Sequence, residues 1–194
     1  MTNNQNKTCS WPGNSPLMNK YHDEEWGVPV HDDRKLFEFI VLDGFQAGLS
    51  WSTILNKREN FRKAFDNFDA EVIANYDEVK IESLLQDAGI IRNKLKIRAT
   101  VSNAKYFLEA QKEFGTFGKY IWQFTGGKTI VNKCRKLEDI PVSTKESDAM
   151  SKDLKKRGFK FVGTTICYAF MQAAGMVNDH MVDCFRYKEV SDKK

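Results

Sequence analysis

The sequence lacks the features that mark membrane, secreted or disulfide-bonded proteins. No apolar run approaches the roughly 20 residues of a membrane-spanning helix, and the polar residues 1–8 contain no signal-peptide core. The 194 residues include four cysteines, too few and too scattered for a disulfide framework: Cys9, Cys134, Cys167 and Cys184. We therefore expect a globular protein of the cytoplasm that does not contact a membrane, with residues 1–8 disordered.

Helix-breaking residues are also scarce. Three of the four prolines lie among the first thirty residues, so the middle of the chain is uninterrupted. Apolar side chains recur at helical spacing, often up to a glycine, in the segments 34–44, 51–68, 69–76, 78–89, 93–115, 117–127, 143–158 and 164–175. Strand-like alternation is confined to 128–131. These patterns predict a single all-α domain over residues 9–187, followed by a flexible tail at 188–194.

Two of the predicted helices are joined by a short turn between Gly158 and Gly163. The first of them opens with a capping pattern at Ser143 and Glu146. Basic residues surround the turn: Lys155, Lys156, Arg157 and Lys160. Backbone N–H groups at the start of a helix attract anions, so the turn suits a phosphate of a nucleic-acid strand, which the net charge of +4 permits. The alternative is a solvated, charged corner between two ordinary helices.

A histidine and a cysteine lie four residues apart near the end of a chain that has only three histidines. On a helix, this spacing would place His180 and Cys184 on one face, where both can bind one tetrahedral metal ion. The alternative is a buried histidine and a free cysteine without a metal.

Further metal ligands must come from distant parts of the chain. Cys167 lies in an apolar run and reads as a buried residue, and His31 lies beside charged residues and reads as exposed. Cys9 and His22 then remain, in a segment that reads as a loop. The H-E-x-x-H motif and the zinc motif of base deaminases are absent, so we expect a structural ion and no catalytic one.

Several long segments resemble one known family: NKYHDEEWGVPVHDDRKLFEFIVLDGFQAGLSW, ILNKRENFRKAF, DAGIIRNKLKI and SDAMSKDLKKRGFKFVGTTICYAFMQAAGMVNDHMVDC. Over residues 9–187 the chain looks like bacterial 3-methyladenine DNA glycosylase I, of the helix-hairpin-helix superfamily. The resemblance implies a helical glycosylase fold and an enzyme that flips 3-methyladenine out of alkylated double-stranded DNA and hydrolyses its N-glycosidic bond. It also implies one structural zinc ion, far from the reaction, held by Cys9, His22, His180 and Cys184.

The resemblance makes the turn at 158–163 a hairpin that contacts DNA phosphates. The residues that it assigns to DNA binding there are Lys160, Gly163, Thr164 and Thr165. Bifunctional relatives carry a nucleophilic lysine just after the turn, where this chain has Thr164 and Thr165. Asn178 stands where the superfamily usually has a catalytic aspartate. Both differences favour a monofunctional enzyme that leaves an abasic site.

The same resemblance assigns the aromatic residues of a base pocket. Tyr21 and Trp51 match the family's stacking pair, and Trp11 and Trp26 are candidates for a second aromatic layer. A cationic ring gains about 2 kcal/mol or more from aromatic faces when it is desolvated. We expect Trp122, which lies far from these motifs, to pack in the core.

Two pocket positions depart from the family pattern. Asp43 takes the acidic position, where a glutamate is expected, and we assign it the catalytic role. Its carboxylate can accept hydrogen bonds from the base and offset the positive charge, although it is one methylene shorter. Met18 stands where a tyrosine is often found, and it provides a soft apolar wall instead. These departures leave other N3-substituted purines open as substrates.

The loop FQAGLSW supplies candidates for filling the gap that a flipped base leaves in the duplex. These are Gln46, Gly48 and Leu49, and the glycine allows a close approach of the backbone. No amphipathic stripe remains for a protein partner, so we expect a monomer. A further alternative is a zinc-stapled DNA-binding module without catalytic activity.

Overall fold

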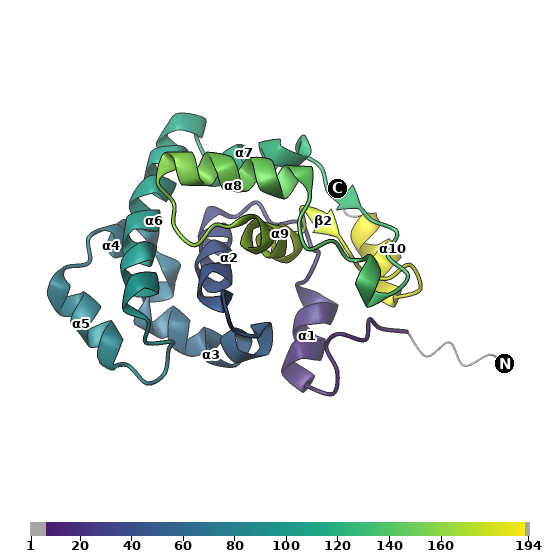
Figure 1. The fold of residues 1–194 in the computed structure, drawn as a ribbon, viewed down its shortest axis with the longest axis horizontal. Helices are drawn as coiled ribbons and strands as arrows, with labels where there is room; N and C mark the ends of the chain where they lie inside the picture. The colour runs from purple at the N-terminus through teal and green to yellow at the C-terminus, as the bar shows by residue number, and fades with distance from the viewer. Residues whose placement is uncertain (1–6, 193–194) are drawn as a thin grey trace.

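The computed structural model describes residues 7–192, which form a cluster of helices with one short strand pair (Figure 1). The helices are α1 Pro16–Glu24, α2 Asp33–Gln46, α3 Trp51–Ala64, α4 Ala70–Ala74, α5 Glu78–Gln86, α6 Lys94–Phe114, α7 Phe117–Trp122, α8 Lys145–Arg157, α9 Thr164–Ala173 and α10 Phe185–Ser191. Single 3-10 turns are η1 Asp66–Phe68, η2 Gln123–Thr125 and η3 Leu137–Asp139. The strands β1 Ile130–Val131 and β2 Val177–Asn178 pair in parallel. The predicted helical fold is confirmed, and no helix within 7–192 is long and apolar enough to cross a membrane.

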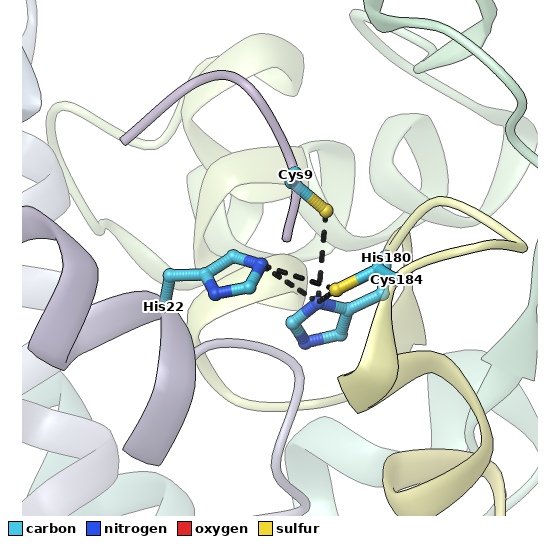
Figure 2. A group of neighbouring side chains, drawn as sticks. All are labelled: Cys9, His22, His180 and Cys184. Carbon is cyan, nitrogen blue, oxygen red and sulfur yellow. Dashed lines mark hydrogen bonds between the residues drawn. The ribbon is translucent and has the colours of Figure 1, made fainter. Parts of the chain in front are cut away.

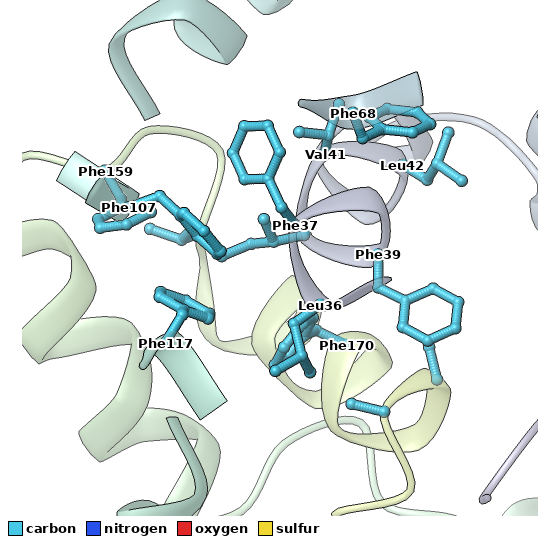
Figure 3. Packing of buried hydrophobic residues seen from close by; sticks show 14 of the residues in the cluster. Leu36, Phe37, Phe39, Val41, Leu42, Phe68, Phe107, Phe117, Phe159 and Phe170 are labelled. Atoms are coloured by element: carbon cyan, nitrogen blue, oxygen red, sulfur yellow. The ribbon is translucent and has the colours of Figure 1, made fainter. Parts of the chain in front are cut away.

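Helix α2 forms the centre of the hydrophobic core. All residues from 36 to 45 are buried, because α3, α6, α7 and α9 pack around this helix. Phe37 of α2 packs near Phe107 of α6 (Figure 3), and their ring centroids are 4.8 Å apart. A helix that is apolar on nearly all sides must lie inside the protein. It therefore carries its one acidic residue near the C-terminal end, Asp43, into the interior, where that residue is 2% exposed.

The end of α2 differs from the sequence prediction. Gly44 is not the end of the helix, which continues for two more residues. Gly44 lies against Phe161, whose Cβ is 3.5 Å from the place that a side-chain Cβ at position 44 would take, which is an ordinary van der Waals distance. Lys96 closes the helix instead, since its Nζ donates to the carbonyl oxygens of Phe45 and Ala47 at 2.7 and 2.6 Å.

Helices α8 and α9 form the predicted pair joined by a short turn. Gly158 ends α8 in the left-handed conformation, at φ 103°, which glycine adopts without strain. The predicted cap of α8 at Ser143 and Glu146 is wrong by one residue. Thr144 takes the extended backbone before the helix, so Thr144 and Ser147 exchange hydrogen bonds between side chain and backbone N–H at this end.

The N-terminal region is more ordered than its composition predicts. The segment that contains His22 reads as a loop, but Pro16 opens helix α1 there, since the missing N–H of proline is not needed in a first turn. Of the residues expected to be disordered, 1–6 lie outside the described part of the chain. The carbonyl of Lys7 accepts a hydrogen bond of 2.9 Å from the first residue of α10. The start of the described chain is thus tied to its C-terminal helix.

The C-terminal region also departs from the prediction. Residues 180–184 do not form a helix: they make a turn between β2 and α10. The pairing of β2 with β1, a segment more than forty residues away, holds the preceding backbone extended. Helix α10 then continues to Ser191 with Val190 fully buried, so the expected flexible tail is helical over 188–191. The last two residues, 193–194, lie outside the described residues.

Candidate functional site

A cavity of about 210 Å³ lies between α1, α2, the start of α3, α9 and the η3 turn. Its lining consists of Trp11, Met18, Tyr21, Trp26, Asp43, Gln46, Trp51, Leu137, Ile140, Ala169 and Gln172. The six residues assigned to substrate binding and catalysis from the sequence are all among them. These six lie within residues 11–51, and the fold adds lining residues as distant in the chain as Gln172.

Aromatic rings form much of the cavity wall. Tyr21 and Trp51 face each other with ring centroids 5.1 Å apart and planes inclined by 47°. Trp11 lies edge-on to Tyr21 at 6.3 Å and to Trp26 at 4.9 Å. Flat walls of this kind accept a planar ligand, and their π faces favour a positively charged one.

Three polar atoms on the wall have no hydrogen-bond partner among the described residues. They are Oδ2 of Asp43 and the Nε1 atoms of Trp11 and Trp51, all shielded from solvent. Leaving a buried donor or acceptor unpaired costs about 1–3 kcal/mol, so native proteins rarely do so without a reason. A ligand with both donors and acceptors at its edges would pair these atoms.

The carboxyl group of Asp43 is unusually easy to protonate. Burial raises the pKa of Asp43 well above its ordinary value, and the Arg58 guanidinium offsets this only in part. The charge of Arg58 is already taken up by Glu38 at 2.6 Å and by Glu25 at 2.9 Å. A positively charged ligand beside Asp43 would favour the carboxylate again, because opposite charges attract strongly in a buried site.

Four buried side chains form a candidate metal centre next to this cavity (Figure 2). They are Cys9, His22, His180 and Cys184, whose ligand atoms all lie within 4.8 Å of one another. The His22 Nε2 to His180 Nδ1 distance is 3.2 Å, and Cys184 Sγ lies 3.6 and 3.7 Å from these nitrogens. A tetrahedral zinc site has edges of about 3.3 Å between nitrogens and about 3.6 Å between nitrogen and sulfur.

The second nitrogen of each histidine in this cluster is already engaged. His22 Nδ1 lies 2.6 Å from a carboxylate oxygen of Asp23, and His180 Nε2 lies 2.9 Å from the carbonyl oxygen of Trp26. Both acceptors require a proton on the facing nitrogen, so His22 Nε2 and His180 Nδ1 keep free lone pairs for a metal ion.

The two thiols of the cluster share their protons unequally. A hydrogen bond from Cys9, supported by both histidines, lowers the pKa of Cys184, while the bond to Cys184 and burial raise that of Cys9. Thiolate and neutral imidazole are the ligands that zinc prefers. These residues therefore fit a zinc ion with four protein ligands.

From the sequence we expected the candidate metal centre to lie far from the cavity, but the structure places it beside the cavity. The rings of Trp26 and His180 are 4.7 Å apart, and those of Trp11 and His22 are 5.5 Å apart. Because both tryptophans line the cavity, the cluster supports one of its walls. The turn of 180–184, and not the predicted helix face, brings the candidate ligands His180 and Cys184 together.

The remaining candidates of the sequence lie elsewhere. Cys134 and Cys167 are buried, each 2% exposed, and belong to no metal cluster found among residues 7–192. His31 is exposed, as predicted. Trp122 packs in the core, as predicted, and its Nε1 donates to the carbonyl oxygen of Val30 at 2.8 Å.

The turn between α8 and α9 is held rigidly and has a basic residue at its tip. The backbone N–H of Lys160 donates to Asn103 Oδ1 at 2.8 Å and its carbonyl accepts from Asn103 Nδ2 at 3.0 Å, while the lysine side chain is exposed. Gly163 precedes α9 with open space at its Cα. Thr165 is exposed, whereas the Thr164 hydroxyl is bonded to side chains of α8.

The loop after α2 lies beside the cavity, since Gln46 and Trp51, which flank it, both line the cavity. Gly48 has φ 81°, a conformation that favours glycine. Leu49 is 42% exposed, a high value for a leucine, and its N–H donates to the carbonyl of Gln46 at 2.6 Å. A tightly turned loop thus holds an apolar side chain toward solvent.

Four lining residues were not identified from the sequence. Ala169 and Gln172 lie one turn apart on α9, so they share one face of this helix. The sequence does not indicate that this face lines a cavity. Leu137 and Ile140 come from the η3 region. No local pattern singles them out, because they reach the cavity only through long-range packing.

Comparison with known proteins assigns this arrangement to a class. A crystal structure of 3-methyladenine DNA glycosylase I has a TM-score of 0.90 at 52% identity, covering 92% of this chain and 98% of that one. A variant of 3-methyladenine DNA glycosylase I in complex with 3-methyladenine has a TM-score of 0.89 at 32% identity, covering 92% and 96%. The chain therefore has the fold of these glycosylases.

Sequence comparison agrees with the structural one. The chain is 52% identical over 179 residues to DNA-3-methyladenine glycosylase 1 of Escherichia coli (strain K12), covering 92% of this chain and 96% of that protein. Residues 11–187 match the sequence model of the methyladenine glycosylase family. This chain belongs to the methyladenine glycosylase family.

Proposed function

We propose that the protein is a monofunctional DNA glycosylase that excises 3-methyladenine from alkylated double-stranded DNA and leaves an abasic site. The observation that carries this proposal is the cavity, in which flat aromatic walls surround three polar atoms that have no partner within residues 7–192. A methylated purine offers a planar positive ring with donors and acceptors at its edge. Membership of the family supports the same substrate class.

The chemistry needs little acid catalysis from the protein. Alkylation at N3 makes the bound adenine cationic, so its bond to the sugar is already weak. Water adds to the sugar C1′, the C1′–N9 bond breaks, its electron pair neutralises the departing base, and the water loses one proton to solvent. Tyr21 and Trp51 hold the ring, and the carboxylate of Asp43 offsets the positive charge of the bound base.

We further propose that DNA lies over the α8–α9 turn and the loop after α2. Lys160 and the N–H groups that follow Gly163 suit a DNA phosphate. Leu49, with Gln46 and Gly48 beside it, suits the gap left by the flipped base. Thr165 is exposed and is proposed to contact the DNA backbone, while the hydroxyl of Thr164 bonds side chains of α8. The proposed species on DNA is a monomer.

The metal cluster is proposed to bind one structural zinc ion. Cys9, His22, His180 and Cys184 would fill all four positions, so the ion would offer no site for a reacting water. Its role would be to tie α1 to the C-terminal turn and to steady Trp11 and Trp26 in the cavity wall, a role that their ring contacts with the two histidines support.

The function is tested by incubating the purified protein with duplex DNA treated with a methylating agent. Chromatography should detect free 3-methyladenine, and the DNA should gain abasic sites that alkali cleaves. Untreated duplex is the control. DNA binding without release of any base would instead support the alternative of a zinc-stapled binding module. Release of other N3-alkylpurines at comparable rates would widen the substrate class.

A further inference from the structure

One polar residue of the cavity lining, Gln172, has no role in the proposed function. Gln172 lies near the end of α9 and lines the cavity together with Ala169. Its side chain is partly accessible, so the amide can reach a ligand in the cavity. The same side chain donates a hydrogen bond to a buried acid that is not among the lining residues.

That acid, Asp179, is held by three donors. Its Oδ2 accepts hydrogen bonds from Gln172 Nε2 and from the Tyr168 hydroxyl, each at 2.8 Å, and its Oδ1 accepts from Asn132 Nδ2 at 2.6 Å. Burial raises the pKa of Tyr168, so its hydroxyl keeps the proton that it donates. Asp179 is 1% exposed and does not line the cavity.

This arrangement leaves only one orientation for the Gln172 amide. A carboxylate can only accept, so the glutamine must turn its NH₂ group toward Asp179. Rotating the amide by half a turn would place two oxygens against each other in a buried site. The amide oxygen Oε1 is therefore directed away from Asp179, and it takes part in no hydrogen bond among the described residues.

We propose that Gln172 is a specificity-determining residue whose Oε1 accepts a hydrogen bond from an N–H group of the flipped, cationic purine. Asp179 is the positioning residue that fixes the direction of this oxygen without touching the base. The inference rests on the proposed function. The cavity would then offer two acceptors, the Asp43 carboxylate and Gln172 Oε1. Two acceptors suit a positive ring that carries an amino group better than they suit a neutral base.

The test compares kcat/KM for 3-methyladenine excision in variants of the full chain. Gln172→Met keeps the length of the side chain and removes the acceptor, and we expect a loss of roughly 10- to 100-fold, the range for a hydrogen bond to a charged group. Asp179→Asn frees the amide to rotate and should lower kcat/KM in the same direction. The double variant should lose no more than Gln172→Met alone, because Asp179 acts through Gln172.

Tyr168→Phe is the matched control. It removes a bond to the same Asp179 oxygen and should lower the melting temperature, yet it should excise within about twofold of the wild type because Tyr168 does not line the cavity. Wild-type kcat/KM for Gln172→Met would overturn the inference while leaving the glycosylase intact. Additive losses in the double variant would overturn the positioning role of Asp179.

Failure of the proposed function would be seen separately, as a wild type that releases no base. Binding of free 3-methyladenine, followed by the fluorescence of the cavity tryptophans, then decides the inference. Binding that is about 10-fold weaker in Gln172→Met than in the wild type supports it. Equal binding by the two proteins, or binding by neither, overturns it.

Discussion

Replacing Asp43 by asparagine is expected to stabilise the protein while it impairs the cavity. Asp43 is 2% exposed, and its Oδ2 has no partner among the described residues. Burial raises its pKa well above the ordinary value, so the folded state prefers the protonated acid. The stability that this proton provides is present at low pH and is lost as the pH rises through the folded pKa.

The size of the effect follows from linkage. Asparagine does not ionise, so the gain in the free energy of unfolding on substitution is constant at low pH. Between the ordinary pKa of an aspartate in the unfolded chain and the raised folded pKa of Asp43, the gain grows by about 1.4 kcal/mol per pH unit. The gain is constant above the folded pKa, where the folded and unfolded states are both ionised, and we expect a size of about 1–3 kcal/mol, the cost of leaving a buried polar group unpaired. For a chain of this size, the corresponding rise in melting temperature is roughly 2–12 °C.

Thermal melts of the wild type and Asp43→Asn between pH 5 and 9 measure this effect. The two melting temperatures should diverge as the pH rises, and Asp43→Glu, which keeps an ionisable acid, should follow the pH dependence of the wild type. Parallel curves for the wild type and Asp43→Asn would refute the reasoning, because they would mean that the carboxyl is not held protonated by the fold.

The same substitution should lower activity. The neutral amide no longer offsets the charge of the bound base, and the loss of one charge-assisted contact corresponds to roughly 10- to 200-fold in excision. Binding to undamaged duplex should not change, since Asp43 lies in the cavity and not on the surface. Excision by Asp43→Asn at the wild-type rate would remove Asp43 from its proposed role.

Three other predictions concern the metal cluster, the DNA surface and the fold. Mass spectrometry should find one zinc per chain in the wild type and in the control Cys134→Ser, but none in Cys184→Ser. Cys184→Ser should also melt at a lower temperature. A wild type that is folded but free of zinc would contradict the proposed metal centre. Lys160→Ala should weaken DNA binding regardless of sequence and reduce the slope of log affinity against log salt by about 1, and an unchanged slope would exclude Lys160 from the DNA surface. Gly175→Ala should cost about 2–5 kcal/mol in the free energy of unfolding, because φ is 68° and the new Cβ would lie 2.2 Å from the carbonyl carbon of Val28. Gly13→Ala, with φ 60° but open space, should cost only about 1 kcal/mol, and equal costs for the two would show that the Val28 contact is not tight.

Features that depend on neighbouring residues were predicted well. Helix α6 ends at Gly115, as the glycine predicts, and the apolar run of α9 is helical and buried on one face. These signals act within one or two helical turns. The same local reasoning failed at Gly44, where the helix continues until Lys96 bonds the carbonyls at its end, and at residues 180–184, which follow the strand β2 that pairs with β1.

The sequence by itself determined the helical class of this protein and, through its long motifs, the family; it also predicted the four candidate metal ligands and the acidic role of Asp43. Only the tertiary structure decided that Oδ2 of this acid is buried without a partner among the described residues, that the Cys/His cluster contacts the cavity wall, and that Gln172 lines the cavity. Helical periodicity and caps depend on residues a few positions apart. The unpaired atoms and the fixed amide instead depend on contacts between segments far apart in the chain, which no local pattern records.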